Sequence, residues 1–301
     1  TYRLYRAVTL LARKSGARIV PLHTRNARFL PSSFTPADKA PRRRFPQLTA
    51  HALPAMDMAA IIDARGRDFS SPANALFDRM AQSRLETTDF SIGLFKAMVD
   101  AAKTYGPGRV IVEDTVTGSL TYKRLLIGAR VLGKRFLAMS EPGEAMGVLL
   151  PNANGAVVTF FALQSAGRVA AMLNYTAGPA NVVSAVKTAR IRTVLSSKAF
   201  IEKAELQNVV EALEANGTQI VWLDELRETV TIFEKISAAM QWHRPLATVD
   251  AEKPAVILYT SGSEGAPKGV VLSHKNLHVN AAQSEARVDI SVEDCLFNVL
   301  P

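Results

Sequence analysis

Apolar residues recur at helical spacing in two segments near the start of the chain, residues 2–14 and residues 72–83, and each segment predicts an amphipathic helix. Between them, the apolar runs at 17–23 and 48–53 predict short strands. Pro21 lies inside the first run. Because proline cannot donate a ladder hydrogen bond, this strand is expected at a sheet edge, or to have the proline at its end.

A polar stretch at 84–89 separates this part from a new apolar pattern that begins at Ile92. Domain boundaries usually fall in polar segments of this kind. The sequence therefore predicts two domains, residues 1–86 and residues 87–301.

From residue 110 onward, short apolar runs alternate with segments of helical periodicity. This alternation predicts an α/β fold in which parallel-rich sheets are covered by helices on both faces. The expected strands are 110–113, 145–150, 169–173, 193–196, 219–223 and 255–259, and the expected helices are 122–137, 155–166, 179–189 and 199–215.

The composition, 48% hydrophobic and 21% charged over 301 residues, is that of a folded chain and excludes disordered and collagen-like classes. Residues 145–167 carry no charge, but Pro151 and Gly155 divide them into a strand, a turn and a helix, so no membrane span is predicted. Cys295 is the single cysteine and has apolar neighbours, which predicts a structural role. The chain starts without Met and stops within an apolar run, as expected of an internal piece of a longer protein.

The net charge of +9 is concentrated at one end of the chain. Residues 1–50 hold eleven Lys and Arg against one acid, Asp38, which leaves 25 basic and 26 acidic residues in the remainder. Such a surface suits anionic lipid headgroups, phosphorylated ligands or nucleic acid, and charge alone does not choose among them. Arg42, Arg43 and Arg44 form the densest basic run and are the candidate headgroup contacts, with a solvated loop as the plain alternative.

A hydroxyl- and glycine-rich loop follows the expected strand 255–259. Its glycines let backbone N–H groups approach an anion, its hydroxyls add donors, and Lys268 adds a mobile positive charge. Gly269 follows the lysine where a Walker A loop requires Ser or Thr, so that motif is excluded. A plain turn remains the alternative. The candidate phosphate ligands are Thr260, Ser261, Gly262, Ser263, Glu264, Gly265, Lys268 and Gly269.

The string YTSGSEGAPKGVVLSH at 259–274 resembles the phosphate-loop signature of the adenylate-forming acyl-CoA synthetase superfamily. Most members have Thr or Ser where this chain has Glu264, and the glutamate is similar to the bifunctional 2-acylglycerophosphoethanolamine acyltransferase/acyl-acyl-carrier-protein synthetase branch. The strings LTYK, LLPNA and AAMLNYTAG, which begin at residues 120, 149 and 170, resemble the same branch. The resemblance covers about residues 90–301.

This resemblance implies ATP-dependent activation of a fatty acid to an acyl-adenylate, with ATP and Mg²⁺ bound at the loop and the acyl group loaded onto acyl carrier protein. Lys268 would stabilise charge on the departing pyrophosphate. The adenine, ribose and catalytic-lysine motifs of the family would all follow residue 301, so this chain alone is expected to be inactive.

The string ARKSGARIVPL at 12–22 resembles the last motif of the glycerolipid acyltransferase fold, which implies that 1–86 is the C-terminal part of such a domain and that a lysophospholipid is a substrate. That family uses a His with an Asp five positions later as its catalytic pair. None of the five histidines here has that partner, so the pair is expected upstream. The branch implies reacylation in phospholipid turnover, on an anionic membrane at the cytoplasmic face of the bacterial inner membrane.

Two other functions stay open. A long-chain acyl-CoA synthetase with a basic leader would share the loop, although Glu264 and the Val20-Pro21 segment argue against it. A non-enzymatic basic adaptor for nucleic acid or membranes would share the charge, but the aromatic residues show no regular interleaving with Lys and Arg, so no nucleic-acid partner is predicted.

Two other groups of residues favour structural roles. His274 and His278 lie four residues apart, as zinc ligands on a helix do, but no third ligand lies near them in sequence. Glu113 and Asp114 form a carboxylate pair that is expected to bound a turn.

Overall fold

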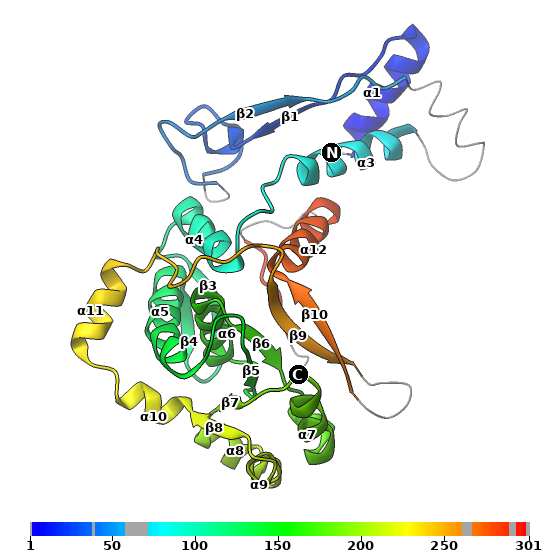
Figure 1. Cartoon of the computed structure of the whole chain (residues 1–301). Helices are drawn as coiled ribbons and strands as arrows, with labels where there is room; N and C mark the ends of the chain where they lie inside the picture. The colour runs from blue at the N-terminus through cyan, green and yellow to red at the C-terminus, as the bar shows by residue number, and fades with distance from the viewer. Residues whose placement is uncertain (1, 38–39, 58–71, 261–266, 289–292, 299–301) are drawn as a thin grey trace. The chain divides into compact units, whose positions relative to one another are not determined.

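The computed structural model describes residues 2–37, 40–57, 72–260, 267–288 and 293–298. The chain divides into two compact units, one of Thr1–Asp89 with Val279–Cys295 and one of Phe90–His278 with Leu296–Pro301. Figure 1 shows the elements of both units. No helix among the described residues is long and apolar enough to span a bilayer.

Among its described residues, the first unit contains two complete helices, a short antiparallel ribbon and a 3-10 turn, and it also includes helix α12 (His274–Arg287) from Val279 onward. Helix α1 packs along helix α3, and Thr9 and Ala12 lie on its buried face. The ribbon pairs β1 with β2, with His23 opposite His51. The elements are α1 (Tyr2–Ser15), β1 (Leu22–Arg25), η1 (Ala27–Phe29), β2 (Thr49–Ala52) and α3 (Pro72–Glu86).

The strand expected at 17–23 is largely wrong. Ile19 makes only an isolated bridge with Met56, and β1 begins after Pro21. Since Pro21 has no N–H to donate, the regular ladder starts beyond it, which confirms the expectation that the proline marks a strand end. The expected helices of this unit and the strand at 48–53 are confirmed to within a few residues.

The second unit is built on a six-stranded sheet in the order β10-β9-β6-β5-β7-β8. All neighbouring pairs are parallel except β10 with β9, which is antiparallel. The α/β, mostly parallel architecture predicted from the alternating pattern is therefore confirmed. The strands are β5 (Ala145–Val148), β6 (Val169–Met172), β7 (Thr193–Ser196), β8 (Gln219–Trp222), β9 (Pro254–Thr260) and β10 (Lys268–Ser273).

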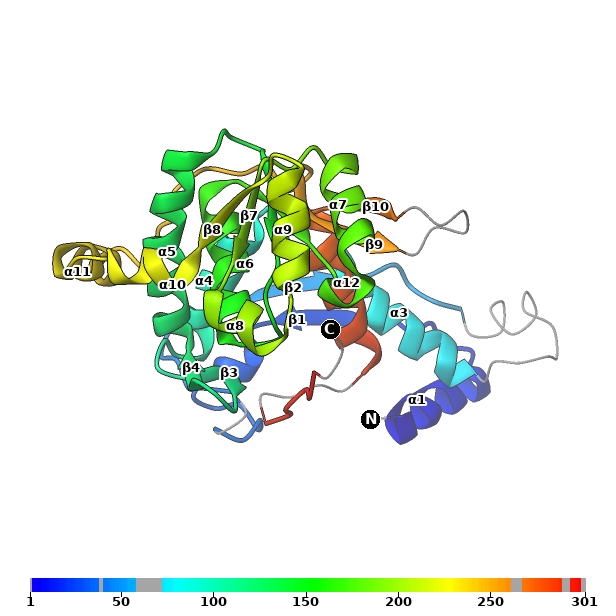
Figure 2. The ribbon, with the colours of Figure 1, turned by 90° about the horizontal axis from the view of Figure 1, so that it is seen from below.

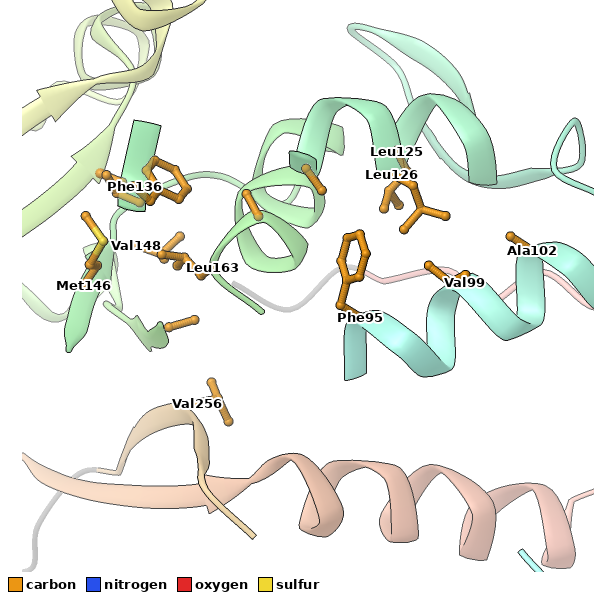
Figure 3. Packing of buried hydrophobic residues seen from close by; sticks show 14 residues of the cluster. Phe95, Val99, Ala102, Leu125, Leu126, Phe136, Met146, Val148, Leu163 and Val256 are labelled. Carbon is orange, nitrogen blue, oxygen red and sulfur yellow. The ribbon is translucent and has the colours of Figure 1, made fainter. Parts of the chain in front are cut away.

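Helices cover both faces of this sheet (Figure 2), as the sequence pattern predicted. On one face, α4 (Leu94–Tyr105), α5 (Tyr122–Met139) and α6 (Asn154–Ala166) enclose a core that includes Phe136 and Met146 (Figure 3). On the other face, α7 (Pro179–Thr188), α8 (Lys198–Lys203) and α9 (Gln207–Ala215) bury Val182 and Leu213 against Val194. The remaining helices are α10 (Leu223–Glu228), α11 (Ile232–Met240) and α12 (His274–Arg287).

Two expectations for this unit are wrong. The strand at 110–113 is not part of the parallel sheet: β3 (Val110–Asp114) pairs antiparallel with β4 (Gly118–Thr121) in a hairpin of its own, which turns at Gly118 with φ +71°. The helix expected at 199–215 is two helices, because Glu205 adopts φ +53° and the Leu206 N–H bonds back to the Ile201 carbonyl. This left-handed ending is usually formed by glycine, so the sequence pattern did not indicate it.

Candidate functional site

The segment with the strongest chemical signal lies on a hairpin at one side of the sheet. Strand β9 runs parallel to β6, with Met172 opposite Leu258, so both strands end at the same edge. In open α/β sheets, the carboxyl edge is where ligands bind. Thr260 is the last residue of β9 and therefore lies at this edge (Figure 1).

The two ends of the loop are held together by strand pairing. Lys268 is the first residue of β10 and lies opposite Thr260 in the antiparallel register. Both residues are solvent-exposed. The Thr260 hydroxyl and the Lys268 ammonium group are both hydrogen-bond donors. They lie at the loop end of the hairpin, where they could donate to an anion bound by the loop.

Gly269 lies opposite Tyr259 in the same register, and space explains the glycine. A Cβ atom at Gly269 would lie 3.3 Å from Ile257 Cγ2 and 3.6 Å from the Tyr259 ring. A side chain at this position would therefore sit tightly against Ile257 and in ordinary contact with the Tyr259 ring. The sequence identified Gly269 as a candidate ligand, and the structure shows that it also permits close packing of the hairpin.

Tyr259 is the residue at this site that the sequence reasoning missed. Its ring packs with the apolar cluster beneath the sheet, and its hydroxyl is buried with no hydrogen-bond partner within the described part of the chain. Burial raises the pKa of Tyr259 to about 12, so the hydroxyl keeps its proton at neutral pH. The position reads as an ordinary strand residue, and no sequence signal distinguished it.

Five of the predicted phosphate ligands, Ser261, Gly262, Ser263, Glu264 and Gly265, lie outside the described residues. Their assignment stays a prediction. The structure brings together Thr260, Lys268 and Gly269 from the same set.

The basic run at 42–44 is divided among three different environments. The Arg42 guanidinium donates to the carbonyls of Arg28 at 3.2 Å and Ser33 at 2.8 Å, and also to that of Thr35. The Arg43 guanidinium lies over the Phe29 ring, 5.4 Å from its centroid, which is within the range of a cation–π contact. Arg44 is exposed. Arg42 therefore organises its own loop, and the headgroup role predicted for these arginines stays a prediction.

Three further side chains have structural partners. The Asp114 carboxylate accepts hydrogen bonds from the Val116 and Thr117 N–H groups inside the β3–β4 turn, which confirms its expected role. His274 is buried, burial lowers its pKa, and its Nδ1 accepts the Leu94 N–H at 3.3 Å. Cys295 is exposed, and its expected structural role stays a prediction.

Known proteins resemble most of the second unit. The profile of the family described as AMP-binding enzyme matches residues 99–301. The chain is 26% identical over 186 residues to 4-coumarate:CoA ligase 1 of Petunia hybrida, which covers 60% of this chain and 32% of that protein. It is also 26% identical over 206 residues to acetyl-coenzyme A synthetase of Dictyostelium discoideum, covering 62% and 31% respectively. The chain thus spans about a third of the length of these curated relatives.

Solved structures agree on the fold. The complex of VinN with L-aspartate superposes with a TM-score of 0.55 at 23% identity, over 66% of this chain and 49% of that one. A second VinN structure gives a TM-score of 0.53 at 25% identity, over 66% and 50%. The family match begins at residue 99, so the acyltransferase resemblance of residues 1–86 rests on sequence strings alone. The match extends over two thirds of the chain and includes the whole β9–β10 hairpin, and on this ground the chain belongs to the AMP-binding enzyme family.

Proposed function

We propose that the complete protein activates a carboxylic acid with ATP and passes the acyl group to a thiol. The carboxylate oxygen would attack the α-phosphorus of ATP, pyrophosphate would leave, and the thiol would then displace AMP from the acyl-adenylate. The observation that carries the proposal is the pairing of Thr260 with Lys268 at the carboxyl edge of the sheet, inside the region that matches the family.

The described residues at the two ends of the loop suit the negative charge of a bound triphosphate. Lys268 supplies a positive charge and Thr260 a hydroxyl. Mg²⁺, which the family uses with ATP, would be held through the phosphate oxygens. When bound, ATP would supply the adenylyl group. Lys268, which strand pairing places opposite Thr260, would hold negative charge that develops on the leaving pyrophosphate.

We further propose a fatty acid as the carboxylate and acyl carrier protein as the thiol, with residues 1–86 belonging to a lysophospholipid acyltransferase domain. Glu264 and the string at 12–22 support this assignment. The basic first 50 residues support an anionic membrane surface as its location, at the cytoplasmic face of a bacterial inner membrane. The proposed membrane location is tested by flotation of the complete protein with anionic phosphatidylglycerol vesicles and with zwitterionic vesicles. Equal flotation with the two kinds of vesicle would contradict it.

The similarity to two CoA ligases favours a second candidate, in which CoA is the thiol. Loading assays of the complete protein with either acceptor separate the two. Palmitate, acetate and 4-coumarate offered side by side would identify the acid class. A product on CoA alone would replace the carrier-protein proposal, while leaving acyl-adenylate formation intact.

The decisive experiment is acid-dependent exchange of labelled pyrophosphate into ATP by the complete protein. Lys268→Gln should lower the exchange rate by about a hundredfold or more, the size typical for losing one preorganised charge-stabilising group. Lys253→Gln is the matched control, because Lys253 is an exposed lysine that immediately precedes β9, at the opposite end of the strand from Thr260. Equal exchange by the two variants would refute the proposed role of the hairpin.

A further inference from the structure

The first unit contains a surface cavity of about 420 Å³ beside the β1–β2 ribbon. His23, Arg25 and Arg28 contribute from the ribbon and the turn after it, and Arg84 contributes from the last turn of α3. Glu285 is the acidic side chain among the described residues of the wall. Three arginines thus line one cavity, with one acidic residue among the described residues of its lining.

One arginine of this cavity, Arg25, is held in place by neutral groups. Arg25 Nη1 donates to the Thr88 hydroxyl at 2.8 Å and reaches the Thr87 hydroxyl at 3.4 Å. Hydroxyl groups orient a guanidinium without cancelling its charge. The Arg28 guanidinium lies 5.1 Å from the centroid of the Phe29 ring. Arg84 forms no ion pair within the part of the chain that the structure describes.

His23, which lines the cavity, is sensitive to the positive charges around it. Burial lowers the pKa of His23, and the charges of Arg25 and Arg84 and the facing His51 lower it further. These are the neighbours that line or flank the cavity, so the positive potential is a property of the site and not of the net charge of the chain.

We infer that this cavity binds the phosphate group of a phosphate ester. Guanidinium groups approaching from β1, from the turn after it and from α3 match a tetrahedral anion, whose oxygens accept hydrogen bonds from several directions. The volume is larger than a phosphate ion needs, which leaves room for an attached glycerol or small headgroup. The site is separate from the ATP-dependent chemistry of the second unit. Only the lipid source of the phosphate rests on the proposed acyltransferase function.

The test uses the full chain labelled at histidine and follows the imidazole NMR signals. The probes are inorganic phosphate and a short-chain lysophosphatidylethanolamine kept below its micelle concentration. We expect saturable movement of the His23 signal, while His243 of the second unit stays unchanged. Arg84→Gln and Arg28→Gln should each weaken binding about tenfold, the loss expected for one charge-assisted hydrogen bond. Both altered residues are exposed, so folding should be retained.

Two controls keep this site apart from others. Arg13→Gln removes the same charge from an exposed position on α1, outside the cavity lining, and should bind like the unaltered chain. Lys268→Gln should not change the His23 response, even if it abolishes pyrophosphate exchange, so the two proposals fail independently. Response to both probes identifies the free phosphate group as the determinant, and response to the lysolipid alone identifies a lipid headgroup. No response of His23 to either probe, or equal weakening by Arg13→Gln, would overturn the inference.

Discussion

Two arginines of the first unit, Arg25 and Arg42, and two of the second, Arg135 and Arg192, bond opposite kinds of partner. In the first unit, Arg42 donates to backbone carbonyls and Arg25 to threonine hydroxyls. In the second unit, Arg192 bonds the Glu144 carboxylate at 2.6 Å, and Arg135 lies 2.9 Å from Glu234. A neutral acceptor meets the hydrogen-bonding need of a guanidinium but leaves its charge, whereas a carboxylate cancels it. The charges of Arg25 and Arg42 therefore persist, whereas those of Arg135 and Arg192 are compensated.

The cores of the two units also differ, in the size of the apolar side chains that they bury. The second unit buries two apolar clusters, one on each face of its sheet, with Phe136 and Leu163 in one and Leu149 and Leu213 in the other. In the first unit, the buried apolar residues that the structure describes are mainly alanines, with Phe29 and Leu76 as the large ones. A sheet covered on both faces buries long side chains in two layers, which a two-stranded ribbon cannot do.

The largest effect should come from emptying the deeper core. Phe136→Ala removes a side chain that is 0% exposed and should cost about 3–5 kcal/mol of unfolding free energy. Phe29→Ala removes one that is 2% exposed, but its ring lies against the long side chains of Arg28 and Arg43, which can move into the space left, so we expect about half that cost. Tryptophan fluorescence reports urea unfolding of the second unit, and hydrogen exchange of peptides from residues 2–52 reports the first. An equal loss of unfolding free energy in the two variants would contradict the proposed difference between the two cores.

A smaller effect tests how closely the helices of the second unit pack. A Cβ atom at Gly133 of α5 would lie 2.9 Å from the Ala162 carbonyl oxygen and 2.8 Å from Leu246 Cδ1. Gly133→Ala should therefore cost about 1–3 kcal/mol through overpacking, measured as a fall in the urea midpoint. Gly155→Ala is the control, since a Cβ atom there would have no neighbour within 4 Å. The stability of Gly155→Ala should be unchanged or slightly higher. If both variants lowered the urea midpoint equally, the helices α5 and α6 would not be closely packed at Gly133.

The turn that holds Asp114 should contribute to the acid sensitivity of the second unit. Burial opposes ionisation of Asp114, but the N–H groups of Thr117, Asn154 and Val116 and the Thr117 hydroxyl outweigh it and lower its pKa to about 2, from 3.8. A carboxylate with a lowered pKa stabilises the fold above its unfolded pKa, and this contribution is lost as pH falls from about 4 to about 2.

Asp114→Asn should accordingly cost on the order of 1 kcal/mol at pH 7 once solvent screening is allowed for, and the difference from the parent chain should vanish near pH 2. Urea melts across this pH range measure it. Glu113→Gln alters the neighbouring exposed carboxylate and should leave the pH profile in place. If the difference in unfolding free energy between Asp114→Asn and the parent chain stayed constant down to pH 2, Asp114 would not be the source of this pH dependence.

The smallest effect concerns the buried hydroxyl at the hairpin. Tyr259→Phe removes a group that has no hydrogen-bond partner among the described residues, so stability should stay within about 0.5 kcal/mol or rise slightly. The thermal midpoint measures this. A loss above 1 kcal/mol would mean that the hydroxyl has a partner in the complete protein.

Much of the fold was predictable because its signals are local. Thr121 accepts the Arg124 N–H at the start of α5, and Gly167 ends α6 with φ +66°, each near the boundary that the pattern indicated. The expected strands at 145–150, 169–173 and 193–196 are observed to within two residues of each end. The loop string led to the family, and the family match confirms that assignment at the level of AMP-binding enzymes.

What the sequence determined by itself was the alternation of strands and helices, the helix ends and the loop that names the family. The tertiary structure decided which strands pair and in which direction: β3 leaves the parallel sheet, and β10 folds back on β9 so that Lys268 faces Thr260. It also decided that Arg42 binds carbonyls while Arg25, Arg28 and Arg84 surround a cavity. The physical reason is the separation along the chain of the residues that interact. Capping and periodicity depend on residues a few positions apart, whereas pairing and charge compensation depend on segments far apart in the chain, and many registers suit the same local pattern.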